Sequence, residues 1–241
     1  MNFILFYILA FISEIIGTIG GFGSSIFLIP LAGFFFDFQT VLAVTAIMHV
    51  FSNISKLVLF HKGIDKRLML LIGLPAVVFV LIGSWLASIL FLKYAELCLG
   101  IFLVVFSAFF FWKPDFQISQ TKSNAVLGGG ISGFLAGLVG TGGAVRGLSL
   151  AAFNLEKNAF IATSAAIDFF VDLSRTIVYL SQGFLEKEYY STIPVLIIIA
   201  FVGSYAGKLI LKVMTNLQFK KVVLSLIFII GIIMIWKTVL E

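Results

Sequence analysis

The chain has 241 residues, of which 61% are hydrophobic and only 11% are charged. Its mean hydropathy is +1.17, whereas a soluble domain carries charge on about 25% of its residues. This composition excludes a soluble globular protein and indicates an integral membrane protein. The formal net charge of +5 does not indicate a nucleic-acid binder, because the lysines lie in short loops, where they set the orientation of a membrane protein. The single cysteine, Cys98, excludes an intramolecular disulfide and a two-cysteine redox relay.

Long apolar stretches divide the chain into candidate membrane spans, because about 17 to 25 apolar residues are needed to cross a bilayer. Two stretches, 3–36 and 124–155, are too long for one crossing, and each is broken by a glycine-rich segment. The arms that follow the breaks, 25–36 and 144–155, hold 12 residues each, about half a bilayer at roughly 1.5 Å per residue. The other candidate spans are 39–60, 68–92, 95–112, 159–181, 190–212 and 218–238.

The two glycine-rich breaks are the most unusual feature of the sequence. The stronger one, Gly-Leu-Val-Gly-Thr-Gly-Gly-Ala-Val-Arg-Gly, occupies 137–147, and a weaker copy, Gly-Thr-Ile-Gly-Gly-Phe-Gly-Ser-Ser, occupies 17–25. Irregular backbone at membrane depth is tolerated only where protein buries it or where it lines a cavity. Two such breaks in corresponding halves of a chain are typical of the central binding site of a secondary transporter.

The two halves of the chain match at a nearly constant offset of 119 to 120 positions. The matches pair the glycines of the two breaks, Asn53-x-Ser55-Lys56 with Asp172-x-Ser174-Arg175, and Gly83-Ser84-Trp85 with Gly203-Ser204-Tyr205. We therefore predict two homologous membrane repeats within one integral membrane domain. The first repeat, with its linker, covers 1–120, and the second covers 121–241.

Loop charges favour one topology over another. If each broken segment crosses the membrane once, the loop lysines and arginines divide seven against five between the two sides. If each broken segment instead re-enters on the side it came from, the division becomes nine against three. The nine are Lys62, Lys66, Arg67, Lys113, Lys122, Lys157, Lys212, Lys220 and Lys221, and the three are Lys93, Lys187 and Lys237. We therefore predict an all-α polytopic protein of two inverted repeats, each with a broken or re-entrant first segment and three spanning helices, and with both termini outside the cytoplasm.

Arg146 lies in the stronger break and is the first candidate for substrate contact. The residues after it can begin a half-helix, whose free N–H groups and positive dipole end attract an anion, and its guanidinium fits an oxyanion. The alternatives are that Arg146 neutralises a nearby acid or snorkels to the interface. The other residues of the two breaks that we expect at the substrate site are Gly140, Thr141, Gly142, Gly143, Gly20, Gly21, Gly23, Ser24 and Ser25.

A polar stripe follows each break. His49, Asn53 and Lys56 have i, i+4, i+7 spacing, which places them on one helix face. Asp168, Asp172 and Arg175 repeat this spacing in the second half. We expect Asn53, Lys56 and Arg175 to contact the substrate. We expect Asp168, Asp172 and His49 to couple transport to protons. Two alternatives stay open here, because Asp172 and Arg175 can pair across one turn and Lys56 can snorkel to the interface.

Glu14 lies within the first broken segment and is a further candidate for proton coupling. Acids at membrane depth are rare and usually face the interior of the bundle. The alternative is that Glu14 is the partner that neutralises Arg146 or Lys56.

The chain resembles the TauE/SafE sulfite exporter family of membrane carriers. The resemblance rests on the glycine motifs at 17–23 and 137–143 and on the two similar halves of four apolar segments each. It covers nearly the whole chain, and it implies transport of sulfur-containing anions such as sulfite, thiosulfate or sulfoacetate. Arg146 departs from the apolar or small residue expected at its position, so its charge either narrows the substrate or pairs internally.

These features predict a secondary transporter in the cytoplasmic membrane that moves a small oxyanion by alternating access, coupled to protons, and the resemblance implies that this anion contains sulfur. We expect lipid and the anion as its partners, no nucleic acid and no cofactor. A second hypothesis keeps the fold but makes Asp168 and Asp172 the ligands of a transported cation. A membrane-embedded enzyme or redox protein is disfavoured, because the sequence has one cysteine, two histidines and no GxxxxGK[ST] motif.

Overall fold

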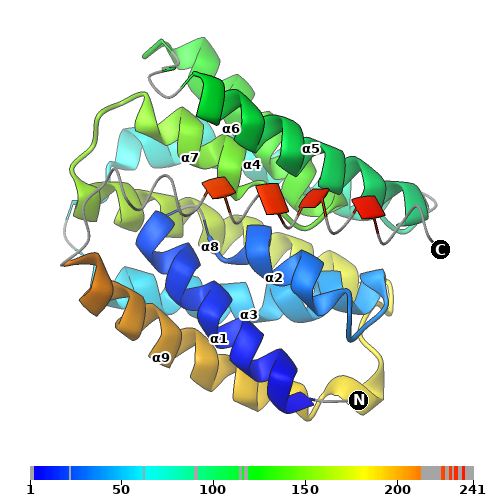
Figure 1. Cartoon of the computed structure of the whole chain (residues 1–241). Coiled ribbons are helices and arrows are strands. Elements are labelled where there is room, and N and C mark those ends of the chain that lie inside the picture. The colour runs from blue at the N-terminus through cyan, green and yellow to red at the C-terminus, as the bar shows by residue number, and fades with distance from the viewer. Residues whose placement is uncertain are drawn as a thin grey trace.

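The computed structural model describes residues 3–21, 23–61, 63–89, 92–113, 116 and 119–212, and pairs of residues between 224 and 236. The described part of the chain is helical and contains no strand, as the sequence predicts (Figure 1). Its helices are α1 (Phe3–Gly20), α2 (Ser25–Ala32), α3 (Phe38–Leu59), α4 (Lys66–Leu86), α5 (Leu92–Trp112), α6 (Lys122–Leu138), α7 (Gly143–Ala151), α8 (Lys157–Ser181), the 3-10 helix η1 (Lys187–Tyr189) and α9 (Thr192–Leu211).

The order of helices is the same in the two halves. A long helix, a short helix and two long helices follow one another as α1 to α4 and again as α6 to α9. Of the described helices, α1, α3, α4 and α9 are long and apolar enough to cross a membrane. The expected span 159–181 corresponds to α8, which carries three charged residues in its middle and is therefore less apolar. The expected span 218–238 and Lys62, Lys220, Lys221 and Lys237 lie largely or wholly outside the described residues.

Each broken segment folds back on itself as a helical hairpin. At the open end of the first hairpin, the ring of Phe36, just after α2, lies 4.8 Å from the ring of Phe6 and 6.4 Å from that of Phe3 at the start of α1. In the second hairpin, Gly142 lies against Ser132 and Gly128 lies against Ser149. The chain therefore returns to the end from which it came, which is the shape that re-entrant segments require. The opposite orientation of the two halves in the membrane stays a prediction.

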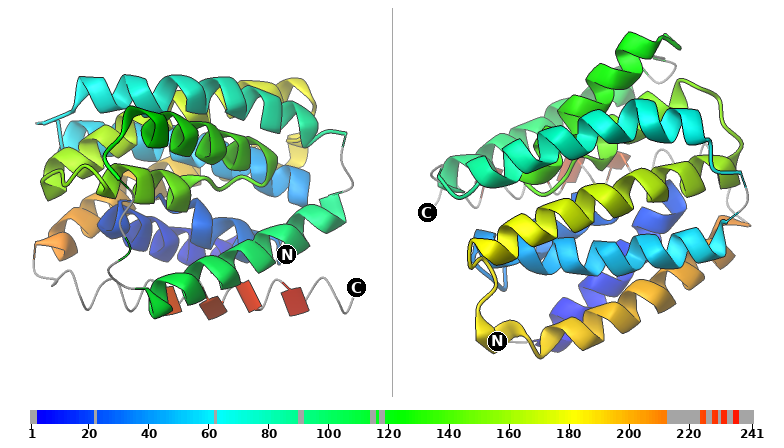
Figure 2. Two further views of the ribbon diagram at one scale, coloured as in Figure 1. Left: turned by 90° about the horizontal axis from the view of Figure 1, so that it is seen from above. Right: turned by 180° about the vertical axis from the view of Figure 1, so that it is seen from behind.

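The two halves exchange a helix. One bundle consists of α1, α2, α3 and α9, in which α9 packs against α1 and α3. The other consists of α6, α7, α8 and α4, in which α4 packs against α6 and α8. Each helix of one bundle has its counterpart from the other half in the other bundle. The counterparts α3 and α8 meet at the interface between the bundles. Figure 1 shows α1, α3 and α9 on one side and α4, α6 and α7 on the other, and the right view of Figure 2, seen from behind, shows the same division. The predicted division at residue 120 falls in the connection between α5 and α6 and stays a prediction.

Glycine allows the exchanged helices to approach very closely. A Cβ atom at Gly129, Gly133 or Gly137 of α6 would meet backbone atoms of α4, so these two helices touch backbone to backbone. In the other bundle, Gly203 and Gly207 of α9 also lie close to α1, where a Cβ atom would meet the side chains of Glu14 and Thr18. Small residues at such contacts are typical of membrane helices, because close approach maximises van der Waals packing.

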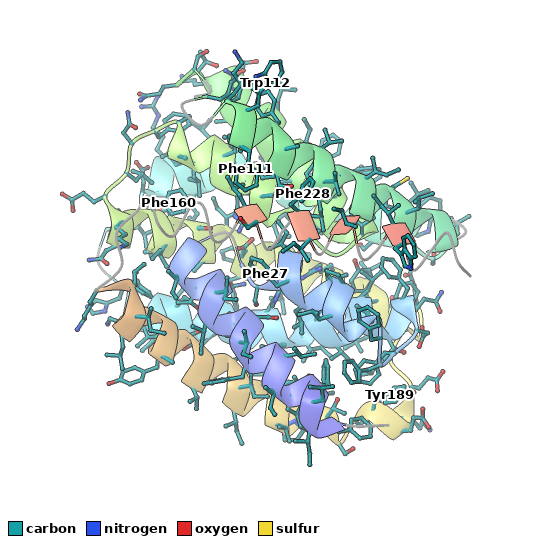
Figure 3. The ribbon with its side chains drawn as sticks, viewed as in Figure 1. Phe27, Phe111, Trp112, Phe160, Tyr189 and Phe228 are labelled. Atoms are coloured by element: carbon teal, nitrogen blue, oxygen red, sulfur yellow. The ribbon has the colours of Figure 1, made fainter. Side chains whose placement is uncertain are left out.

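Aromatic side chains cover much of the periphery, as Figure 3 shows for Phe111 and Trp112 of α5. Trp112 is 78% exposed, as expected for a residue at the end of a membrane helix. Phe36 is different, because it is buried and its ring packs edge-on against Tyr189, 5.0 Å away. It closes the end of the first hairpin and does not face lipid.

Candidate functional site

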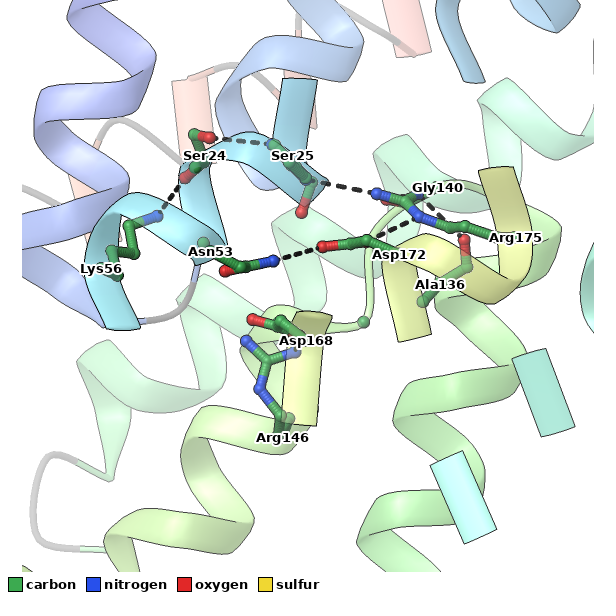
Figure 4. A pocket seen from close by; sticks show the side chains of 15 residues that line it. Ser24, Ser25, Asn53, Lys56, Ala136, Gly140, Arg146, Asp168, Asp172 and Arg175 are labelled. Atoms are coloured by element: carbon green, nitrogen blue, oxygen red, sulfur yellow. Dashed lines mark hydrogen bonds and ion pairs between the residues drawn. The ribbon is translucent and has the colours of Figure 1, made fainter. Parts of the chain in front are cut away.

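The two breaks meet at the interface between the bundles. The hydroxyl of Ser25, at the start of α2, donates to the Thr141 hydroxyl 3.3 Å away, which joins the two breaks directly. A pocket that opens to solvent lies beside this contact (Figure 4). Its lining residues are Gly23, Ser24, Ser25, His49, Ser52, Asn53, Lys56, Ala136, Gly140, Gly142, Gly143, Arg146, Asp168, Asp172 and Arg175.

Left-handed backbone turns the chain within each break. Gly21 has φ of 68° and Gly140 has φ of 80°, a region that costs residues with a Cβ atom roughly 1–2 kcal/mol. A side chain at Gly140 would also meet Ile29 and Leu42. The glycines therefore serve the turn and the close packing that bring the N-termini of α2 and α7 to the pocket.

Arg146 projects from α7 and pairs with Asp168 of α8 (Figure 4). Its Nε also donates to the Ser164 hydroxyl at 3.2 Å, and that hydroxyl donates to the carbonyl oxygen of Gly21 at 2.9 Å. Arg146 is 4% exposed. The internal pairing expected as an alternative is therefore present, and it places a guanidinium at the pocket wall next to the turn of the first break.

Arg175 supports the second break. Its Nε donates to Asp172 at 2.8 Å, and its Nη1 donates to the carbonyl oxygens of Gly140 at 2.6 Å and Ala136 at 3.2 Å. The Tyr179 hydroxyl, one turn further along α8, donates to the carbonyl oxygen of Gly137. Carbonyls at the C-terminal end of a helix have no partner within the helix. Arg175 and Tyr179 therefore satisfy the end of α6 from outside.

Glu14 is fully buried and accepts five donors. It pairs with Lys56 at 2.9 Å. The remaining donors are hydroxyls from α1, the first break, α3 and α9: Thr18 at 3.0 Å, Ser24 at 2.7 Å, Ser52 at 2.6 Å and Ser204 at 2.8 Å. Of the two partners considered for Glu14, the structure places Lys56 against it. Lys56 accordingly points into the protein and does not snorkel.

His49 connects the two halves of the site. Its Nε2 lies 2.8 Å from the Ser24 hydroxyl, and its Nδ1 lies 3.2 Å from Nη2 of Arg175. Arginine can only donate, so Nδ1 must accept and the proton of a neutral imidazole is assigned to Nε2. Asn53 makes a second link between the halves, because its amide donates to Asp172 at 2.7 Å. The two polar stripes predicted from the sequence thus face each other across the α3–α8 interface.

Most of the predicted residues come together at this pocket. The predicted residues that do not line it are Gly20, Gly21, Thr141 and Glu14. Thr141 contacts the lining residue Ser25, and Glu14 contacts the lining residue Lys56. Gly21 is joined to the lining residue Arg146 through Ser164. Sequence reasoning missed Ser52, Ser164, Ser204 and Tyr179. Tyr179 follows Arg175 by four positions and so continues the Asp168–Arg175 stripe, and Ser204 lies in a segment that matches between the halves. The sequence therefore contained a signal for both residues.

The charges at the site balance. Lys56, Arg146 and Arg175 each contact one carboxylate, from Glu14, Asp168 and Asp172 respectively. Buried charges are tolerated when they are paired and hydrogen-bonded in this way. The arrangement can present cationic donors and two helix N-termini to an anion, but any added charge must be compensated.

Comparison with known proteins gives one family and one curated relative. The family model described as "Sulfite exporter TauE/SafE" matches residues 6–234. A "probable membrane transporter protein" of Methanocaldococcus jannaschii is 28% identical, and the match covers 95% of this chain and 92% of the relative. No solved structure matches the chain.

Proposed function

Since the chain belongs to the sulfite exporter TauE/SafE family of multi-pass membrane transporters, we propose that it moves a small sulfur-containing oxyanion or organosulfonate through the pocket between its two bundles. Sulfite, thiosulfate and sulfoacetate are the candidate substrates. Protons are the proposed coupling ion, and both termini are proposed to lie outside the cytoplasm.

The observation that carries this proposal is the meeting of the two half-helices. The N-termini of α2 and α7 border the same pocket, with Arg146 at its wall. Helix N-termini bind anions because their first N–H groups lack partners within the helix and the helix dipole is positive there. Ser24 and Ser25 add hydroxyls, and Lys56 and Arg175 add positive charge behind them.

The pocket also lies where a transporter needs it. It is bordered by both bundles, with the α2–α7 and α3–α8 contacts beside it. Movement of one bundle relative to the other would open it to one side of the membrane or the other. In such a movement each moving body would contain helices of both halves, because α4 and α9 are exchanged between the bundles.

Anion binding to purified protein tests the proposal. Sulfite, thiosulfate, sulfoacetate and sulfate are compared by thermal shift with wild type, Arg146→Gln and the control Arg67→Ala, whose side chain is exposed at the start of α4. We expect one sulfur anion to stabilise wild type and the control, and its affinity to fall at least about tenfold in Arg146→Gln, as for loss of a hydrogen bond to a charged group. No stabilisation by any anion would contradict the proposal.

A cation transporter is the second candidate, because Asp168 and Asp172 line the same pocket. Asp172 already accepts from Arg175 and Asn53, and the part of the chain that was described holds no cluster of three or more metal-ligating side chains. Cation binding that weakens in Asp168→Asn and is unchanged in Arg146→Gln would favour this candidate over the anion.

A further inference from the structure

The proposed function leaves open which group takes the proton. Four ionisable side chains were expected to couple transport to protons, namely Glu14, His49, Asp168 and Asp172. Their surroundings differ sharply, and the differences separate them.

Glu14 and His49 are each fixed by several contacts. Protonation of Glu14 would give up part of a set of five donors and leave Lys56 without its carboxylate. Protonation of His49 at Nδ1 would point an N–H at the guanidinium of Arg175, 3.2 Å away. Glu14 and His49 therefore each keep one charge state, and both hold the first break in place through their contacts with Ser24.

Asp172 is also held on two sides. One carboxylate oxygen accepts from Arg175 at 2.8 Å, and the other accepts from Asn53 at 2.7 Å across the bundle interface. Its protonation would loosen the contact between α3 and α8 and the arginine that supports the second break.

Asp168 is the exception. Within the described residues it has one partner, Arg146, and it is the most exposed of the three carboxylates, with 11% of its side-chain surface accessible. The charged and titratable groups that face it are Arg146 from α7, Lys56 and His49 from α3, and Asp172 and Arg175 from its own helix. The lining residues contributed by α2 and α6 are serine, glycine and alanine, and α4 contributes none.

We propose that Asp168 takes up one proton when the anion binds, and that the anion replaces its carboxylate as the partner of Arg146. The inference rests on the proposed function. Before binding, three cations balance three carboxylates, so an anion would bring uncompensated charge into a poorly solvated pocket, which is costly. Neutralising Asp168 offsets one of the two negative charges that a dianion such as thiosulfate brings, and it frees the guanidinium of Arg146 at the pocket wall to face the other.

Calorimetry of thiosulfate binding tests this step, because thiosulfate has no group that titrates near neutral pH. Titrations into full-length protein in two buffers of different ionisation enthalpy report the number of protons taken up per anion. We expect about one proton for wild type and for the control Glu188→Gln, an exposed acid in η1. Asp168→Asn should take up none.

The pH dependence of affinity supplies a second readout. If each anion binds together with one proton, the affinity of wild type for the anion should fall about tenfold per pH unit. This fall begins above the pKa that the coupling group has in the anion-free protein. Asp168→Asn, which is permanently neutral, should bind with an affinity that does not change with pH. If that variant cannot be purified, Asp168→Glu keeps the carboxyl group and should keep the proton uptake of wild type.

The outcomes are distinct. Thiosulfate binding to wild type without proton uptake overturns the role of Asp168 and leaves the proposed function standing. Proton uptake that persists in Asp168→Asn also overturns it and returns the role to another acid. If neither thiosulfate nor sulfite, sulfoacetate or sulfate binds to wild type, the proposed function fails and the inference fails with it.

Discussion

Helices α3 and α8 occupy equivalent places in the two halves but hold the site in different ways. The polar row of α3 reaches side chains: Lys56 and Ser52 contact Glu14, and His49 contacts Ser24. The polar row of α8 reaches backbone: Ser164 donates to Gly21 and Arg175 donates to Gly140. These two residues are eleven positions apart, about three helical turns, and so lie on one face.

This difference shows how two similar halves acquire different tasks. Helix α8 supports the turns of both breaks, so its position sets the position of both half-helices. Helix α3 fixes one buried carboxylate, which ties α1, the first break and α9 together. We therefore expect substitutions on α8 to disturb the whole site and their counterparts on α3 to act locally.

The largest effect is expected for Arg175→Met. It leaves Asp172 without its cation and the Gly140 carbonyl without its arginine donor, and loss of one partner of a buried ion pair costs about 3–5 kcal/mol. Unfolding in detergent, followed by tryptophan fluorescence, should show this loss of stability, while Arg67→Ala stays near wild type. Equal stability of the two variants would break the assignment of a structural role to α8.

Glu14→Gln should be nearly as damaging, at about 3 kcal/mol, because Lys56 is left as an unpaired buried charge. The same unfolding measurement applies. The double variant Glu14→Gln with Lys56→Met removes both charges and should recover much of the lost stability. If the double variant is no better than the single one, the ion pair is not what holds the first half together.

Tyr179→Phe removes one hydroxyl and leaves the Gly137 carbonyl without that donor. The expected cost is about 1–2 kcal/mol. Residue 60, the counterpart of Tyr179 in the first half, is already a phenylalanine, so the variant makes the two halves more alike. A neutral result would mean that Arg175 alone is sufficient to support the end of α6.

A smaller effect, about 1 kcal/mol, is expected for Ser164→Ala, because it removes the hydrogen bond to the Gly21 carbonyl and the acceptor of Arg146 Nε, while Arg146 keeps its pairing with Asp168. Its counterpart Thr45 donates to the Val41 carbonyl within its own helix. Thr45→Val should therefore change the stability by less than about 0.5 kcal/mol. Measured side by side, the pair shows directly whether α8 supports a break that α3 does not.

The sequence predicted where the site lies better than how it is connected. Glycine breaks and i, i+4, i+7 stripes depend on local spacing, so they located the half-helices and the polar faces of α3 and α8. Which cation meets Glu14 depends on the packing of α1 against α3, and periodicity carries no information about that. A serine such as Ser164 lies on a helix among alanines and threonines, so only its contact with Gly21 distinguishes it from the others.

The exchange of α4 and α9 between the bundles has a consequence for how the protein is made. The hydroxyl of Ser204 that completes the Glu14 cluster follows that acid by 190 positions. At a synthesis rate of about 5–20 residues per second, α1 exists for roughly 10–40 s before its partner α9 has been translated. During that interval Glu14 is already within reach of Lys56, which belongs to the same half. The first bundle is therefore finished only when the second half has almost entirely been made.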